Sequence, residues 1–466
     1  MSEVLLICPN ALDIKIHPIF DEIEPLFLTL AEQRGLVGLA RGAIVPPTEL
    51  LTLSTYLIDA GISVSILDLT LEALKDNNIR DAINKKLKNE DPKIVGIRAN
   101  EICFIDQYKE ISSLVKNYNP DIMLIIGGVA ATGYDTDLLS DKNINFIVRG
   151  EGELTFLELC TSILNNKKLN GLNGISFISN KEYIRNPDRE LLDLSTLKLP
   201  TRDIYPLKEL YKLNGGIDLV YTSRGCPFNC SFCNAPSFWK HKWRGRKPED
   251  IVDELLLIQE QGAKIVHIHD VNFGVNIKWV KKICELIRDN GLELYWDCQL
   301  RVDQLKKQTL KTLYTGNCRS AFIGIESASQ ASLDGSNKNY STRSLINALN
   351  RSKQDGIHID GGYVVGLPDD NLDSLQATKN LAITLFEKDL VETPIYFLFI
   401  PWKGSHVGDN PEKFGIKIEN YDVRYWHGFT AKPVASTKTV DAKTVYSFWE
   451  KGWSEIREIL SKKISN

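Results

Sequence analysis

Short apolar runs alternate with longer amphipathic stretches over the first 165 residues of the chain. The apolar runs are VLLIC, SVSILDL, KIVGI, IMLIIGG and FIVRG, and one amphipathic stretch ends in LLTLSTYLIDAG. Apolar runs of this length between helical stretches are typical of buried parallel strands. We therefore predict a Rossmann-like, doubly wound parallel sheet over residues 1–165, whose ligands lie beyond the carboxyl ends of its strands.

A second alternation of the same kind begins at Leu219. Its apolar runs are LVYTS, KIVHIHD, LYWDCQL, SAFIGIE, IDGGYVVG and TPIYFLFI. Helical patterns separate these runs near residues 249–261, 276–289, 304–315, 343–354 and 372–386. Because crossovers between parallel strands are right-handed, the six units predict a partial (β/α)6 barrel over residues 216–400, with its active site at the C-terminal strand ends.

The other two segments have weaker patterns. Residues 166–215 contain several Pro and Asn residues and little helical periodicity, which indicates a connector with a small hairpin. After Pro401 the sequence becomes irregular and rich in aromatic residues, and we assign residues 401–466 to a C-terminal cap. The expected fold class is therefore α/β in both large domains.

Composition narrows the possible function classes. The 466 residues are 43% hydrophobic and 25% charged, with a formal net charge of -4, as in ordinary soluble globular proteins. Without a broad basic field, nucleic acid is not an expected partner. The start MSEVLLICPN lacks a signal-peptide pattern, and no run approaches the ~20 apolar residues of a spanning helix. We expect a cytoplasmic protein with no membrane partner.

Three of the nine cysteines are closely spaced. Cys226, Cys230 and Cys233 lie just after the run LVYTS. Cysteine thiolates are the usual ligands of iron-sulfur clusters, and a four-iron cluster normally takes four of them. A structural zinc site would need a fourth ligand at tight spacing, and the nearest histidine, His241, lies beyond an aromatic segment. We predict a [4Fe-4S] cluster with one iron left open.

The residues around these cysteines carry a family resemblance. The string TSRGCPFNCSFCN over residues 222–234, followed by WRGRKPEDIVDE over residues 243–254, resembles the radical S-adenosylmethionine (SAM) superfamily. The similar branch carries an N-terminal cobalamin-binding-type domain. The resemblance implies that SAM chelates the open iron and is cleaved reductively to a 5'-deoxyadenosyl radical. It also implies a flavodoxin- or ferredoxin-type electron donor and a small-molecule or peptide substrate.

The resemblance places further residues around SAM. Phe232 matches the aromatic residue before the last cysteine, Glu326 follows Gly324 in a strand-end motif, and Gly366 begins a Gly-Leu-Pro turn. For the polar members of the set, the alternative is a structural cap of a strand or helix. The expected SAM-binding residues are Phe232, Asp270, Asn272, Arg301, Gly324, Glu326 and Gly366.

Loops of the first sheet stand where cobalamin-binding relatives approach their cofactor. Glycine there permits close backbone approach. The sequence Asp-x-His-x-x-Gly is absent, so no histidine reaches cobalt in the usual way. The resemblance implies that the loop after the third strand, residues 98–101, faces cobalt, and we expect Arg98 to lie under the corrin. The alternative is a domain that keeps the fold without the cofactor. The expected cobalamin-binding residues are Arg98, Gly127, Gly128, Gly150, Glu151 and Gly152.

Two reactions remain open at this point. The first is cobalamin-dependent methylation of an unactivated carbon. The second is a rearrangement, or an epimerisation that forms D-residues in a ribosomal peptide, with Cys298 or Cys318 as hydrogen donor and no cobalamin. For both thiols the alternative is a small buried packing residue. A third class, a cluster protein for electron transfer or binding, is disfavoured by the SAM-side motifs.

Overall fold

The computed structural model describes residues 1–33, 44–167, 169, 171–338 and 340–465. The chain folds into two compact units. The first comprises Met1–Ile14 and Ala43–Leu213, and the second comprises Lys15–Gly42 and Asn214–Asn466. A stretch that follows the first strand in sequence therefore belongs to the second unit.

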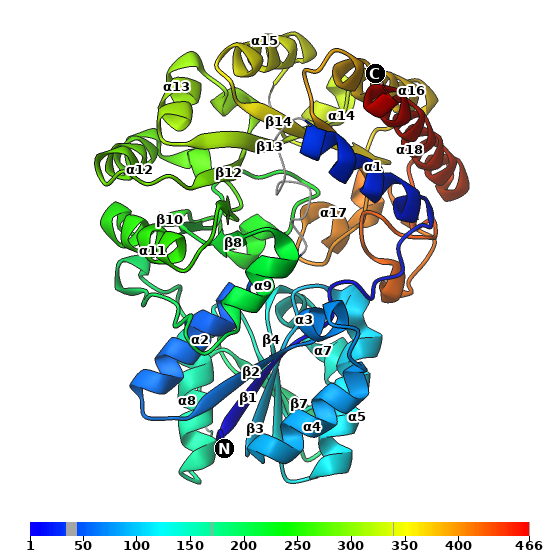
Figure 1. Ribbon diagram of the computed structural model, residues 1–466. Helices are drawn as coiled ribbons and strands as arrows, with labels where there is room; N and C mark the ends of the chain where they lie inside the picture. The colour runs from blue at the N-terminus through cyan, green and yellow to red at the C-terminus, as the bar shows by residue number, and fades with distance from the viewer. Residues whose placement is uncertain (34–43, 168, 170, 339, 466) are drawn as a thin grey trace. The chain divides into compact units, whose positions relative to one another are not determined.

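A seven-stranded sheet in the order β2-β1-β3-β4-β5-β6-β7 is the centre of the first unit (Figure 1). The first five strands pair in parallel, which confirms the predicted doubly wound sheet. The expected hairpin is β6–β7, and it continues the sheet by antiparallel pairing with β5. The strands are β1 (Val4–Cys8), β2 (Val64–Asp68), β3 (Ile94–Arg98), β4 (Met123–Gly127), β5 (Phe146–Val148), β6 (Ile175–Ser179) and β7 (Glu182–Arg185).

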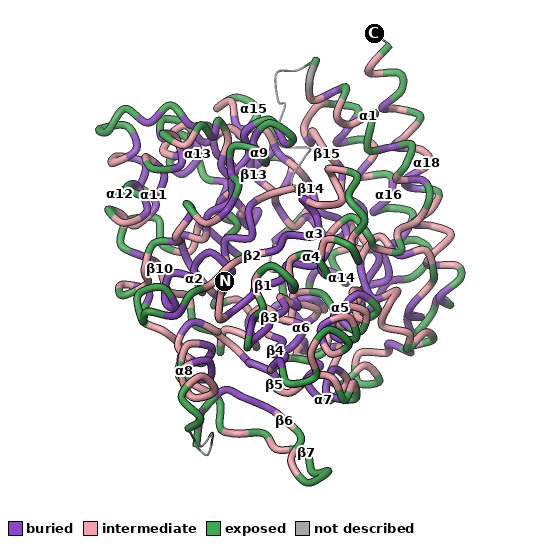
Figure 2. The backbone as a smooth tube through the Cα atoms, turned by 60° about the horizontal axis from the view of Figure 1, so that its bottom comes forward, coloured by how far each residue is buried: buried purple, intermediate pink, exposed green. Residues whose placement is uncertain are grey.

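Helices cover both faces of this sheet, because its central strands are apolar on both sides and every residue of β1 is buried. Figure 1 shows α2 and α8 on one side of the sheet and α4 and α5 on the other. In Figure 2 the strands β1, β3 and β5 are largely buried, whereas β7 and the tip of the β6–β7 hairpin are largely exposed. The helices are α2 (Thr48–Asp59), α3 (Leu69–Leu74), α4 (Ile79–Glu90), α5 (Ile105–Tyr118), α6 (Val129–Gly133), α7 (Asp135–Leu138), α8 (Gly152–Leu164) and α9 (Leu207–Asn214).

The second unit is built on a six-stranded parallel sheet in the order β15-β14-β13-β12-β11-β8. Neighbouring strands follow one another in sequence, which confirms the six predicted units of a partial barrel. The strands are β8 (Ile217–Val220), β11 (Ile265–Ile268), β12 (Tyr295–Leu300), β13 (Cys318–Glu326), β14 (His358–Val365) and β15 (Thr393–Leu398). The helices between them are α11 (Pro248–Glu260), α12 (Ile277–Asp289), α13 (Lys307–Thr315), α14 (Gln330–Gly335), α15 (Thr342–Gln354) and α16 (Leu372–Glu387).

The cap begins irregularly and ends in a long helix that the pattern had not predicted. Its short elements are α17 (His406–Asp409), β16 (Lys417–Ile418) and β17 (Ala435–Ser436), and the final helix is α18 (Ala442–Ser465). The helix α1 (Ile19–Gln33) packs against α18 within the second unit. No helix in the described ranges has both the length and the apolar character needed to cross a membrane.

Candidate active site

The three closely spaced cysteines lie in a loop that leaves the carboxyl end of β8. The loop is entered through β9 (Ser223–Arg224), which pairs antiparallel with β10 (Arg244–Gly245), and α10 (Ala235–Phe238) follows the cysteines. Gly225 has a φ of 88°, and a Cβ there would overlap the Lys242 carbonyl. Glycine is therefore required where the returning chain closes the loop.

The thiols fit a cluster better than a single metal ion. Cys226 and Cys230 are buried, Cys233 is half-buried, and none forms a disulfide. Burial raises the pKa of Cys226 and raises the pKa of Cys233 to about 12, and the Cys230 sulfur adds to both shifts. Such thiols need a metal to become thiolates.

A mononuclear site does not fit this loop. Among the described residues, no three His, Cys, Asp or Glu side chains converge on one metal ion. That disfavours zinc, which requires all its ligands around a single centre. It agrees with an iron-sulfur cluster, because each cysteine of a four-iron cluster binds a different iron.

Asp270, just after β11, anchors the start of the cysteine loop. Its buried carboxylate accepts hydrogen bonds from the Thr222 N–H at 2.7 Å and from the Thr222 and Ser223 hydroxyls at 2.6 Å each. Asn272 accepts from the Gly274 N–H at 3.2 Å, and its amide lowers the pKa of Cys226 against the larger effect of burial. Asp270 therefore contacts the start of the cysteine loop, and Asn272 contacts Cys226 within it.

The other side of the loop is held by the segment after β13 and by the cap. Ser231 donates through its N–H to the Ser336 carbonyl at 3.3 Å and through its hydroxyl to the Gly335 carbonyl at 3.0 Å. The Val407 N–H donates to the Ser231 carbonyl at 3.0 Å. Phe232 packs against an apolar cluster of the cap and the strand ends. The backbone between the last two cysteines is thus fixed from two directions.

Arg301, after β12, reaches the same loop. Its buried guanidinium donates from Nη1 to Cys230 Sγ at 3.6 Å and from Nη2 to the Lys338 carbonyl at 2.9 Å. Nε donates to the Asp303 carboxylate at 3.0 Å. The guanidinium carbon lies 3.9 Å from the centroid of the Phe228 ring. A fixed cation therefore lies against one of the three cysteines.

Glu326, at the end of β13, pairs with Lys338. The Lys338 Nζ lies 2.6 Å from Glu326 Oε1, and both side chains are less than a tenth exposed. Burial alone would lower the pKa of Lys338, but the charges of Glu326 and Cys230 raise it, so the ammonium stays charged. A Cβ on Gly324 would overlap the Glu326 carboxylate and lie 2.8 Å from Nζ. The glycine makes room for the ion pair.

The turn after β14 is fixed by Asp370. Gly366 has a φ of 90°, and its N–H and that of Leu367 donate to the buried Asp370 carboxylate at 3.1 and 3.0 Å. Because β13 and β14 are parallel neighbours, this turn and Glu326 lie at the same edge of the sheet.

Cys298 and Cys318 lie away from this edge. A bulge in the pairing of β12 with β13 places Cys318 on the same face as Cys298. Both are buried, and Cys298 interacts with Cys318 and with Cys284 of the outer helix α12. Asp297 has the opposite orientation and contacts His267. These positions suit packing between the sheet and its helices.

At the carboxyl edge of the first sheet, the loops after β3 and β4 pack closely against their neighbours. Arg98 ends β3, and its Nη1 lies 3.4 Å from one Glu49 oxygen while Asn100 donates to the other at 3.1 Å. Gly128 has a φ of 125°, and a Cβ there would lie 2.6 Å from the Ala99 carbonyl oxygen. Glycine is therefore required at position 128, because the loop after β3 packs directly against it.

The remaining glycines of this edge differ from Gly128. A Cβ on Gly127 or Gly152 would make only ordinary contacts at 3.5 Å, with Val148 and Leu53 respectively. Gly150 has a φ of 69°, and a Cβ there would meet nothing within 4 Å. Gly150 is thus a left-handed position beside open space.

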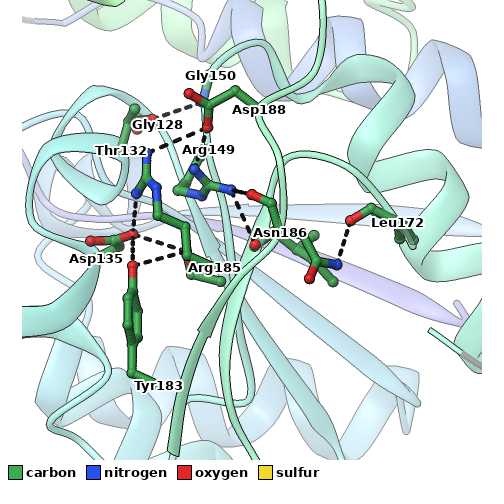
Figure 3. A network of polar contacts seen from close by, with 12 residues as sticks. Gly128, Thr132, Asp135, Arg149, Gly150, Leu172, Tyr183, Arg185, Asn186 and Asp188 are labelled. Atoms are coloured by element: carbon green, nitrogen blue, oxygen red, sulfur yellow. Dashed lines mark hydrogen bonds and ion pairs between the residues drawn. The ribbon is translucent and has the colours of Figure 1, made fainter. Parts of the chain in front are cut away.

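Arg149, just before Gly150, ties β5 to the hairpin (Figure 3). Its buried guanidinium donates to Asp188, to the Asn186 carbonyl and, at 3.2 Å, to the Ile175 carbonyl. Glu151 accepts from the Leu192 N–H at 2.6 Å, and α8 begins at Gly152 without a capping side chain. An open glycine beside a helix start is a feature that an anionic ligand tail can use.

Two residues of the barrel edge escaped the sequence reasoning. Lys338 lies in the polar stretch SNKNY, and nothing in the local pattern marks it as the partner of Glu326. Asp370 follows the Gly-Leu-Pro turn and precedes the N-cap Asn371, and an acid in that position was a readable signal for a turn anchor.

Family comparisons agree with this arrangement of two units. The model of the Radical SAM superfamily matches residues 220–382, and the model of the B12 binding domain matches residues 35–160. An uncharacterized methyltransferase of Pyrococcus horikoshii is 31% identical over 366 residues, which is 78% of each chain. The anaerobic magnesium-protoporphyrin IX monomethyl ester cyclase of Rubrivivax gelatinosus is 26% identical over 85% of this chain and 71% of its own.

Two kinds of solved structure share the fold. The radical SAM methyltransferase TsrM of Kitasatospora setae, with cobalamin and a [4Fe-4S] cluster bound, matches with a TM-score of 0.71 at 18% identity, over 91% of this chain and 81% of its own. The cobalamin-dependent radical SAM enzyme OxsB, with aqua-cobalamin and SAM bound, gives a TM-score of 0.73 at 19% identity, over 96% and 66%. At these identities the likeness is one of fold.

Proposed function

The chain belongs to the radical SAM superfamily and carries a B12-binding domain, and from that premise we propose that it is a cobalamin-dependent methyltransferase of an unactivated carbon. The observation that carries the proposal is the edge of the partial barrel, where the cysteine loop, Arg301 and the Glu326–Lys338 pair meet. When bound, the cluster and SAM supply a 5'-deoxyadenosyl radical for hydrogen abstraction, and cobalamin supplies a transferable methyl group.

The residues of the second unit divide this work. Cys226, Cys230 and Cys233 would hold the cluster, and Asp270 would keep their loop in shape. Glu326 would face the SAM amino group, since its carboxylate already holds an ammonium at 2.6 Å. Phe232, Gly324, Asn272 and the Gly366 turn complete the proposed SAM surroundings.

In the first unit, the space beside Gly150 and the start of α8 would accommodate cobalamin. Gly150 and the start of α8 would receive the nucleotide tail, with Gly127, Gly128, Glu151 and Gly152 shaping the loops. Arg98 would lie under the corrin, held by Glu49. The proposed domains are residues 1–165 for cobalamin, 166–215 for the connector, 216–400 for the radical SAM barrel and 401–466 for the cap. The first of these is corrected by the fold, because Lys15–Gly42 belongs to the second unit.

The epimerase alternative receives no support from the thiols. Cys298 and Cys318 pack with Cys284 beside the outer helices, which does not favour a hydrogen donor at the barrel edge. The relatives named above are a methyltransferase and a cyclase.

A small-molecule substrate and a flavodoxin- or ferredoxin-type donor complete the proposal. The exposed cations Lys240 and Lys242 follow the cysteine loop directly, and they would suit an acidic electron donor.

Anaerobic reconstitution with iron, sulfide and hydroxocobalamin tests the proposal. After desalting, we expect cluster absorption, retained corrin bands, and 5'-deoxyadenosine formation from SAM under reduction. Replacing all three loop cysteines by Ala should abolish both the cluster and 5'-deoxyadenosine, whereas Cys160→Ala in the first unit should not. Radical formation in a protein that retains no corrin would contradict the methyl-transfer assignment.

Arg98 gives a sharper test of the cobalamin site. Arg98→Ala should reduce corrin retention several-fold while leaving the iron content unchanged. Arg80→Ala is the matched control, because Arg80 is 69% exposed on α4 of the same unit. Equal corrin retention in all three proteins would remove Arg98 from the proposed site.

A further inference from the structure

Arg301 is fully engaged by the protein before any cofactor is considered. Each guanidinium nitrogen has a partner: Nη1 the Cys230 sulfur, Nη2 the Lys338 carbonyl and Nε the Asp303 carboxylate. Stacking on Phe228 holds the plane of the group, and the residue is 8% exposed. An arginine whose donors are all occupied by the protein holds its positive charge at a fixed position and has no donor nitrogen left for a ligand.

A second cation, Lys338, lies beside the same loop. The Lys338 carbonyl accepts a hydrogen bond from Arg301, and its ammonium pairs with Glu326. The Lys338 Nζ also lies 5.8 Å from the centroid of the ring of Phe232, which stands between Cys230 and Cys233 in the sequence. Two positive groups therefore lie beside the cysteine loop. The counter-charge of Lys338 is the buried Glu326, whereas that of Arg301 is the more exposed Asp303.

We propose that Arg301, assisted by Lys338, raises the reduction potential of the iron-sulfur cluster by holding positive charge against the Cys230 sulfur. The inference rests on the proposed function, because it presumes the cluster. On reduction the cluster gains one electron, and the negative charge on its thiolate ligands grows. A buried cation hydrogen-bonded to a ligand sulfur stabilises that reduced state more than the oxidised one. The guanidinium cannot lose its proton, so the effect is permanent.

Such tuning has a purpose in this chemistry. Clusters of this type span a wide range of potentials, which are set by net charge, hydrogen bonds to sulfur and solvent exposure. A cluster whose potential is too low is reduced only in a small fraction of molecules by a given donor. Arg301 is thus a positioning residue: it holds a positive charge against Cys230 and affects the cluster through that sulfur.

The test is a redox titration of the full reconstituted chain, followed by electron paramagnetic resonance, without SAM or substrate. We expect Arg301→Gln to lower the reduced-to-oxidised ratio at a fixed potential about tenfold, equivalent to about 59 mV for a one-electron couple. Arg301→Lys should recover part of the shift. Lys338→Met should shift the potential in the same direction. Arg319→Gln removes a cation from the opposite end of β13 and should leave the potential unchanged.

Every outcome decides the question. A potential for Arg301→Gln equal to that of the wild type, at equal iron content, would overturn the inference. If Arg301→Gln binds no iron, Lys338→Met decides: a lowered potential supports the charge effect, and an unchanged one overturns it. A wild-type chain that assembles no cluster would instead contradict the proposed function, and methyl transfer is measured separately, so the two failures are distinguishable.

Discussion

Glu326 shows how a single residue at the barrel edge accepts backbone strain. Its φ of 60° lies in the left-handed region that residues other than glycine rarely adopt. The residue stands at a register shift between β13 and β14. Strain of this kind costs roughly 1 to 3 kcal/mol and persists at functional sites. Here it turns the carboxylate back over Gly324 toward Lys338.

This geometry predicts the effect of Gly324→Ala. The added methyl would overlap the Glu326 carboxylate, so the carboxylate or the strand must move. We expect SAM affinity to fall at least tenfold and unfolding free energy to fall by about 1 to 3 kcal/mol, the usual cost of overpacking. Equilibrium dialysis with SAM and thermal melting of the reconstituted protein check both. Unchanged SAM affinity would show that Glu326 need not occupy this position.

Asp360 of β14 predicts a pH dependence of stability. Burial raises the pKa of Asp360 to about 6, and the charges of Asp297 and Glu392 add to the shift, whereas hydrogen bonds from Thr393 and Ser320 oppose it. Because this pKa is higher in the folded than in the unfolded state, the folded state binds the proton more tightly. Stability therefore falls as pH rises from about 4 to 6 and stays lower above that window.

His267 lies on the same face and acts in the same direction. Burial alone would lower the pKa of His267, but Asp297, Asp360 and Asp218 raise it, so its stabilising charge is also lost as pH rises. Asp360→Asn should stabilise the protein by about 1 to 3 kcal/mol at pH 8 and little at pH 4. Calorimetric melting at both values measures this. Asp289→Asn, at an exposed site, should give equal shifts at both pH values, and the same equality for Asp360→Asn would contradict the prediction.

At the scale of elements, the β6–β7 hairpin is held to the first sheet by polar contacts in addition to the apolar packing of Ile175 and Phe177. Asp135 of α7 accepts hydrogen bonds from Ser176 at 2.9 Å and from Tyr183 and Arg185 at 2.6 Å each (Figure 3). Burial alone would raise the pKa of Asp135, but these three partners hold it below its usual value. The stabilisation is present above the unfolded-state pKa and is lost as pH falls through the folded one.

Asp135→Ala should therefore loosen the hairpin selectively. The buried donor Ser176 loses its acceptor, and so do the more exposed donors Tyr183 and Arg185. The loss at Ser176 costs about 1 to 3 kcal/mol. Hydrogen exchange of the backbone amides in β6 and β7 should accelerate by a factor of ten or more, while β1 and β3 keep their protection. Thr136→Ala, an exposed neighbour, is the control. Uniform exchange across the sheet in both variants would contradict a local role.

At the scale of the whole molecule, local periodicity was enough for most of the fold. All six barrel strands and five of the helices between them were predictable, because each has a hydrophobic periodicity that marks its buried face. The short α14 was not predicted. The helix α18 was missed although Val445, Trp449, Trp453, Ile456 and Leu460 recur at helical spacing. Its many aromatic residues favoured an irregular interpretation. Which unit α1 would join was not predictable, because no local pattern names a distant partner.

The site divides in the same way. The cysteine spacing and the strand-end motifs were visible because their signal is local. The partners of those residues were not: Lys338 meets Glu326, and Arg301 meets Cys230, only after separate strand ends are brought to one edge. The face on which Cys318 lies depends on a bulge, which strict alternation along a strand cannot reveal.

The placement of α1 yields a prediction that separates the two units. Phe20 of α1 lies edge-on to Trp453, with ring centroids 4.9 Å apart, and to Phe429 at 5.0 Å. All eight tryptophans of the chain lie between residues 239 and 453, so tryptophan fluorescence reports on the second unit alone. Phe20→Ala should lower the free energy of unfolding seen by fluorescence by about 2 to 4 kcal/mol. Leu12→Ala, a 47% exposed position of the first unit, should leave this transition unchanged. An unshifted fluorescence transition in Phe20→Ala would mean that α1 contributes nothing to the stability of the barrel unit, in spite of its packing on α18.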